Sequence, residues 1–175
     1  AVLDSGIMKS HQAFLGPDGF SRVVRSVNLV GRGSGVFQAM GYAPGSVERA
    51  AYEASIDNGA STNPDPYGHG THVAAVAAGR STHTLFQTAG VAPGAKLFDV
   101  RVLGNDGTGT MVDVLAGLEW VAHHAKAYNI RVVNLSLAAD STESWQTDPL
   151  AIAARAVTAT GITVVVSGGN FGQSA

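Results

Sequence analysis

The chain has 175 residues, a formal net charge of −2 and no cysteine. Hydrophobic residues make up 45% of it and charged residues 14%, which lies on the apolar, lightly charged side of globular averages, and the chain is long enough for a sizeable core. The lack of cysteine excludes disulfides, thiolate metal sites and a cysteine nucleophile. A small net charge without runs of Lys or Arg gives no sign of binding to nucleic acid or an anionic membrane. No apolar stretch has the length of a transmembrane helix.

Apolar runs rich in β-branched residues predict four buried strands, at residues 1–3, 96–103, 130–137 and 162–167. Helical patterns lie between them. One is expected from His69 to Gly79, one begins after the capping residue Thr110, and one runs from the pair Asp148-Pro149 to Gly161. Alternating strands and helices predict an α/β fold, a doubly wound, mostly parallel sheet with helices on both faces.

Residues 32–64 do not fit this alternation. The segment is rich in Gly, Ser, Ala and Asn, and we expect a surface excursion with one helix at about residues 46–55. Its polar residues Asp57, Asn58 and Asn63, with the following Asp65, are oxygen ligands for a cation, but a solvated loop is the simpler interpretation.

Candidate polar residues follow the predicted strands. Asp4 ends the first strand, residues 136–138 end the third, and Gly168, Gly169 and Asn170 follow the fourth. Because ligands of open parallel sheets bind beyond the carboxyl ends of the strands, we expect these residues at one edge of the sheet.

Asp4 is a carboxylate at the end of a buried strand. Burying its charge costs free energy unless the carboxylate accepts a hydrogen bond. The turn at Gly6 permits the side chain to point into the crevice. The alternative is that Asp4 only caps its own turn.

His69 and His72 lie in the Gly- and Ala-rich stretch "DPYGHGTHVAAVAAG", residues 65–79. His69 follows Gly68 at a predicted helix start, where the helix dipole disfavours an imidazolium and favours a neutral base. Helical zinc motifs space two histidines at i, i+4 with a glutamate between them, whereas these are at i, i+3 without one. We therefore interpret His69 as a candidate base and His72 as a hydrogen-bonded structural residue, and predict no metal here.

Asn170 lies in "SGGNFG", residues 167–172. Its side-chain amide has two N–H donors that suit an oxyanion. The alternative is an ordinary turn residue beside glycine.

Three blocks in this order resemble the subtilisin-like serine peptidases, or subtilases. They are "AVLDSGI" (1–7), "GHGTHVAAVAAG" (68–79) and "VVVSGGNFG" (164–172), and the stretches "GVAPGAKLFDVRVLGNDGTG" (90–109) and "VVNLSLA" (132–138) match as well. The resemblance covers residues 1–31 and 65–175. It implies a three-layer fold, here incomplete, and makes 32–64 an insertion within a single partial peptidase domain, 1–175.

The resemblance implies that Asp4 orients and polarises His69, which acts as general base and then acid, and that the Asn170 amide binds the oxyanion. It also implies that an extended peptide binds as an added strand and that a specificity pocket lies beside it. The implied substrate-binding residues are Gly107, Thr108, Gly109, Ser136, Leu137, Ala138, Ser167, Gly168 and Gly169.

The nucleophilic serine of such a peptidase is not identified in this chain. The family places it in a Gly-Thr-Ser-Met-Ala-like block after the asparagine, and no such block follows Asn170. The serines nearest the predicted site are Ser5, Ser136, Ser167 and Ser174. We therefore expect a chain truncated before its nucleophile and inactive by itself.

The predicted activity is a serine endopeptidase in the full-length protein. An inactive peptide-binding module with the same fold is the first alternative, and a metal-dependent hydrolase using Asp4, His69 and His72 is the second. The resemblance implies a polypeptide substrate, with a propeptide or the rest of the domain as further partners, and an extracellular or cell-envelope location. No cofactor is required by it. Calcium is common in the family, but the loop 80–90 offers few oxygen ligands.

Overall fold

The computed structural model describes residues 1–81, 90–139 and 141–170. In chain order the elements are β1 (Val2–Asp4), η1 (Gln12–Phe14), β2 (Val23–Asn28), α1 (Gly33–Met40), α2 (Val47–Ile56), α3 (His69–Ala78), β3 (Leu97–Arg101), α4 (Met111–Tyr128), β4 (Val132–Leu135), α5 (Pro149–Ala159) and β5 (Thr163–Val166).

The strands form one parallel sheet in the order β2-β3-β1-β4-β5. In β1, Val2 is in register with Asp99 of β3 and with Asn134 of β4. β1 is therefore the central strand, and Asp4 lies in the middle of the carboxyl edge. The predicted doubly wound α/β fold is confirmed.

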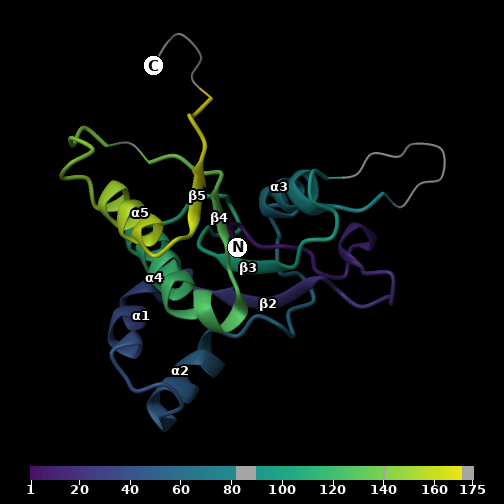
Figure 1. Ribbon diagram of the computed structural model, residues 1–175, viewed down its shortest axis with the longest axis horizontal. Helices are drawn as coiled ribbons and strands as arrows, with labels where there is room; N and C mark the ends of the chain where they lie inside the picture. The colour runs from purple at the N-terminus through teal and green to yellow at the C-terminus, as the bar shows by residue number, and fades with distance from the viewer. Residues whose placement is uncertain (82–89, 140, 171–175) are drawn as a thin grey trace.

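Helices cover both faces of the sheet (Figure 1). On one face, Ala74 and Ala78 of α3 pack with Val2, Ile7 and Leu97. On the other face, a larger core joins α1, α4 and α5 to the sheet, and the fully buried Trp120 of α4 belongs to it. No helix among the described residues is long and apolar enough to cross a membrane.

The predicted capping residues are confirmed. The hydroxyl of Thr110 accepts the Asp113 N–H at 3.2 Å at the start of α4, and Oδ1 of Asp148 accepts the Ala151 N–H at 2.9 Å at the start of α5. Gly161 follows α5 with φ of 89°, a left-handed conformation that ends the helix.

Three elements, η1, β2 and α1, were not predicted. Arg25 interrupts the apolar residues of β2, so its sequence shows neither alternation nor a continuous apolar run. In the structure, the pairing of β2 with β3 also shifts register between Val23 and Arg25. α1 contains Gly33 and Gly35, which are poor helix formers. The helix forms because tertiary contacts stabilise it.

Those contacts show that residues 32–64 are not merely the predicted surface excursion. Val36, Ala39, Met40 and Ile56 are buried in the core that includes α4. The predicted helix is present as α2, capped by Ser46. That the segment is an insertion relative to other family members stays a prediction.

Candidate active site

Asp4 and His69 form a direct hydrogen-bonded pair. Nδ1 of His69 lies 2.8 Å from Oδ1 and 3.0 Å from Oδ2 of Asp4. The Asp4 side chain is only 1% exposed, whereas that of His69 is 42% exposed. The strand end thus supplies a buried carboxylate, and the first residue of α3 supplies an imidazole whose other edge reaches solvent.

The close approach of α3 to β1 depends on Gly70. A Cβ atom at this position would lie 2.2 Å from the carbonyl oxygen of Gly6 and 3.0 Å from Cβ of Asp4. Gly6 itself has φ of 124°, a conformation that side chains rarely permit. Glycine at both positions is what lets the helix start contact the strand end.

The prediction that Asp65 belongs to a solvated loop is wrong. It is 5% exposed and not part of a solvated loop. Its carboxylate accepts hydrogen bonds from the Ser5 hydroxyl, from Gly68 N–H, and from both N–H and hydroxyl of Thr71. The local signal was the acidic residue in "DPYGH", because Asp side chains often accept hydrogen bonds from nearby backbone N–H groups.

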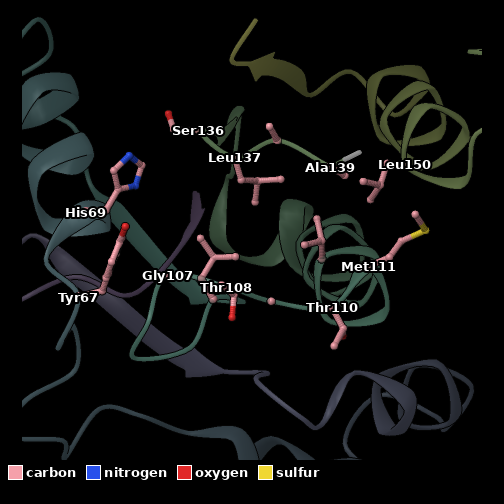
Figure 2. A pocket seen from close by; sticks show the side chains of 14 residues that line it. Tyr67, His69, Gly107, Thr108, Thr110, Met111, Ser136, Leu137, Ala139 and Leu150 are labelled. Atoms are coloured by element: carbon pink, nitrogen blue, oxygen red, sulfur yellow. The ribbon is translucent and has the colours of Figure 1, made fainter. Parts of the chain in front are cut away.

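His69 borders a groove at the carboxyl edge of the sheet with a cavity volume of about 380 Å³ (Figure 2). Residues 107–109 form one side of it and residues 136–138 the other, with Tyr67 beside His69. The structure therefore brings together the two segments that were expected to flank a peptide.

The remaining predicted substrate-binding residues line a neighbouring cavity. Ser167, Gly168 and Gly169 border it together with Leu137 and Ala138, and its volume is about 480 Å³. The hydroxyl of Ser167 donates to the Leu137 carbonyl oxygen at 2.9 Å, which ties the two walls together. Asn170 is exposed after β5, and its role in binding an oxyanion stays a prediction.

His72 is not a hydrogen-bonded structural residue. It is exposed on α3, and its imidazole has no hydrogen-bond partner among the described residues. Within the described part of the chain, no group of three or more His, Cys, Asp or Glu side chains is arranged to hold a metal ion. Most of the loop 80–90, including His83, lies outside the described residues, so calcium binding there is untested.

The chemical capacity of the site follows from the Asp4–His69 pair. Because an ionised carboxylate only accepts hydrogen bonds, the contact places the proton of neutral His69 on Nδ1. Nε2 is then the free acceptor of the half-exposed ring, as a general base requires. The fold and the site together define a class of protein: an α/β domain with a carboxylate–imidazole pair beside a groove.

The chain belongs to the subtilase family, because the model of that family matches residues 1–175. It is 41% identical over 125 residues to subtilisin-like protease 3 of Pseudogymnoascus destructans, covering 70% of this chain and 28% of that protein. Identity to subtilisin BL of Lederbergia lenta is 37% over 121 residues, covering 69% of this chain and 41% of that protein. A cuticle-degrading serine protease of Arthrobotrys oligospora is 32% identical over 174 residues, which are 99% of this chain and 32% of that protein.

Solved structures share the fold. Sphericase superimposes with a TM-score of 0.67 at 23% identity, covering 99% of this chain and 46% of that one. The S41 psychrophilic protease gives a TM-score of 0.64 at 25% identity, covering 97% of this chain and 44% of that one. The chain thus spans less than half of the length of these relatives and structures.

Proposed function

We propose that the protein to which this chain belongs is a serine endopeptidase that cleaves peptide bonds through an acyl-enzyme. In this proposal His69 takes the proton of the attacking serine and later gives it to the leaving amine, while Asp4 holds the imidazole in the required tautomer. The observation that carries it is the pair of contacts, at 2.8 Å and 3.0 Å, between a buried carboxylate and an imidazole that borders the groove.

The nucleophile is assigned to a serine outside residues 1–175. The Ser5 hydroxyl is buried between the carboxylates of Asp4 and Asp65. Ser136 accepts a hydrogen bond from Asn134, and Ser167 donates to a backbone carbonyl. Ser174 lies outside the described residues and lacks a preceding Gly-Thr.

The groove is proposed to bind substrate as an extended strand between residues 107–109 and 136–138. The cavity between residues 136–138 and 167–169 would take the side chain next to the scissile bond, and the amide of Asn170 would donate to the oxyanion. Family resemblance supports these roles, together with an extracellular or cell-envelope location.

The test is labelling of the complete protein with a fluorophosphonate probe, followed by identification of the modified residue. Labelling of one serine in the wild type, and its loss in His69→Ala, would support the proposal. If the folded complete protein binds peptides but neither labels nor hydrolyses them, the proposal is wrong and the molecule is a peptide-binding module.

A further inference from the structure

Asp65 is a buried charged residue close to the Asp4–His69 pair that the proposed chemistry does not use. It lies four residues before His69, the first residue of α3, and it joins the two segments that carry the Asp4–His69 pair. On the α3 side, Oδ1 accepts the Gly68 N–H at 2.9 Å and Oδ2 accepts the Thr71 N–H at 2.8 Å. These are N–H groups at the helix start that no backbone carbonyl satisfies, so the carboxylate is the cap of α3.

The cap residue itself supplies no such bond. Gly68 occupies the N-cap position with φ of 89° and has no side chain to accept one. The orientation of the first turn, and with it the direction of the His69 side chain, therefore depends on Asp65.

On the strand side, Asp65 acts through Ser5. The Ser5 hydroxyl lies 2.8 Å from Oδ1 of Asp65 and 3.2 Å from Oδ1 of Asp4. It also accepts the Gly70 N–H at 3.0 Å. The Ser5 backbone N–H donates to Asp4 at 2.7 Å, so this residue contacts both carboxylates and the helix.

We propose that Asp65 is a positioning residue that fixes the first turn of α3 against the strand end and thereby holds His69 and Asp4 at hydrogen-bond distance. Only the kinetic test of this inference rests on the proposed peptidase function. Thr71 extends the connection, because its hydroxyl bonds to Asp65 and accepts the N–H of Met8 in the turn after β1.

The first variant is Asp65→Asn in the complete protein. The amide keeps the size of the carboxylate but replaces one acceptor oxygen by a donor, so the hydrogen bond from Gly68 N–H or the one from Thr71 N–H is lost. Small displacements of catalytic groups cost up to about 100-fold in rate. We expect kcat to fall by about 10- to 100-fold with KM changed by less than about twofold.

Ser5→Ala is the second variant, because it keeps the contacts of Asp65 with α3 and removes the hydroxyl that links Asp65 to Asp4 and to the Gly70 N–H. It should lower kcat in the same direction, and it tests the inference if Asp65→Asn does not fold. Ser46→Ala is the matched control, since Ser46 caps α2, away from α3, by the same kind of side-chain bond (Figure 1). It should reduce stability and leave kcat unchanged.

A spectroscopic readout separates this inference from the proposed function. The Nδ1 proton of His69, held by Asp4, should give a downfield ¹H NMR resonance that moves or broadens in Asp65→Asn and Ser5→Ala but not in Ser46→Ala. This result is expected even if the wild type proves not to be a peptidase. Folded Asp65→Asn and Ser5→Ala proteins with wild-type kcat and an unmoved resonance would overturn the inference, as would equal losses in the Ser46→Ala control.

Discussion

At the scale of single residues, the contact between Asp4 and His69 depends on the carboxylate of Asp4, and an amide in its place changes the tautomer of His69. Asn at position 4 would fit the same buried space but would present an N–H group or a weaker acceptor to Nδ1 of His69. The ring would then favour the tautomer with its proton on Nε2, which cannot accept a proton from a nucleophile.

We therefore expect Asp4→Asn to lower kcat of the complete protein by about 10⁴-fold while the fold is retained. Steady-state kinetics and a thermal melt check this result. The exposed Asp57, replaced in the same way, is the control and should keep wild-type kinetics. Turnover of Asp4→Asn within tenfold of the wild type would contradict the assigned role.

Asp99 on β3 is another buried carboxyl group, 1% exposed, between Val2 and Ser26 of the neighbouring strands. Burial raises the pKa of Asp99 from its ordinary value of 3.8 to about 8. Between these two pH values the folded state holds one proton more than the unfolded state. The free energy of unfolding therefore falls as the pH rises through this interval, and the slope from this group ends above it.

The prediction is that Asp99→Asn removes this contribution to the slope. Relative to the wild type, the variant should gain stability progressively from pH 4 to pH 8, and it should be the more stable protein at pH 9. Urea unfolding at a series of pH values measures the difference. The exposed Asp18→Asn serves as control, and a parallel pH dependence of Asp99→Asn and wild type would show that Asp99 is not the group responsible.

At the scale of elements, the contact of α3 with β1 is limited by the size of residue 70. Because an added Cβ would meet backbone oxygen of Gly6 at 2.2 Å, the helix start must move away from the strand end. We expect Gly70→Ala to destabilise the protein by about 1–3 kcal/mol and to lower activity strongly, since Asp4 and His69 lie on the separated elements.

Gly94→Ala is the control for this change, because a Cβ at position 94 would meet no atom within 4 Å. Its melting temperature should stay at or above that of the wild type. Thermal melts and kinetics of both variants are the measurement. Equal stability of Gly70→Ala and Gly94→Ala would mean that the close approach of α3 is not a constraint.

α1 makes the main packing contact of the segment 32–64 with α4, and α2 adds polar side-chain contacts to the same helix. Glu53 of α2 accepts a hydrogen bond from the Trp120 indole at 3.3 Å and lies 3.0 Å from Nε2 of His124, both on α4. Arg49 donates to the same carboxylate at 3.2 Å.

Removing this acceptor leaves a buried indole N–H unpaired, so we expect Glu53→Ala to cost about 1–3 kcal/mol of stability. The exposed Glu48→Ala on the same helix should change stability by less than about 0.5 kcal/mol. Denaturant midpoints of the two variants test the difference. Matching midpoints would argue that α2 is held by its apolar contacts alone.

At the scale of the whole molecule, β5 is one of the two edge strands of the described sheet and pairs with β4 on one side only. Its Val166 is 63% exposed, and Val165 is exposed as well. Exposed apolar edges pair with other chains. We expect residues 1–175, produced alone, to associate or precipitate at micromolar concentration.

Size-exclusion chromatography with light scattering checks the state of this chain. Val166→Lys should shift it toward the monomer, because a charged side chain on an edge strand opposes edge-to-edge pairing. A wild-type chain that is monomeric and melts sharply would contradict this prediction.

Local signals in the sequence determined much of the architecture. The strands β1, β3, β4 and β5, the caps of α4 and α5 and the span of α3 were predicted, because strand composition, capping and glycine at helix ends act within a few neighbouring residues. Asp4 and His69 could be placed at one edge because parallel strands end together. β2 and α1 could not be predicted, since Arg25 interrupts the one and glycines weaken the other.

Only the tertiary structure decided which polar residues act together. Asp65 looked like a loop residue, yet it is buried because the folded chain surrounds it with the donors of Ser5, Gly68 and Thr71. His72, one turn from His69, faces solvent instead. Residues 32–64 were predicted to be a surface excursion, but some of their apolar side chains belong to the core. The physical reason is the same in each case: hydrogen-bond donors and apolar partners that are distant along the chain set the cost of burying a residue, and no local pattern records them.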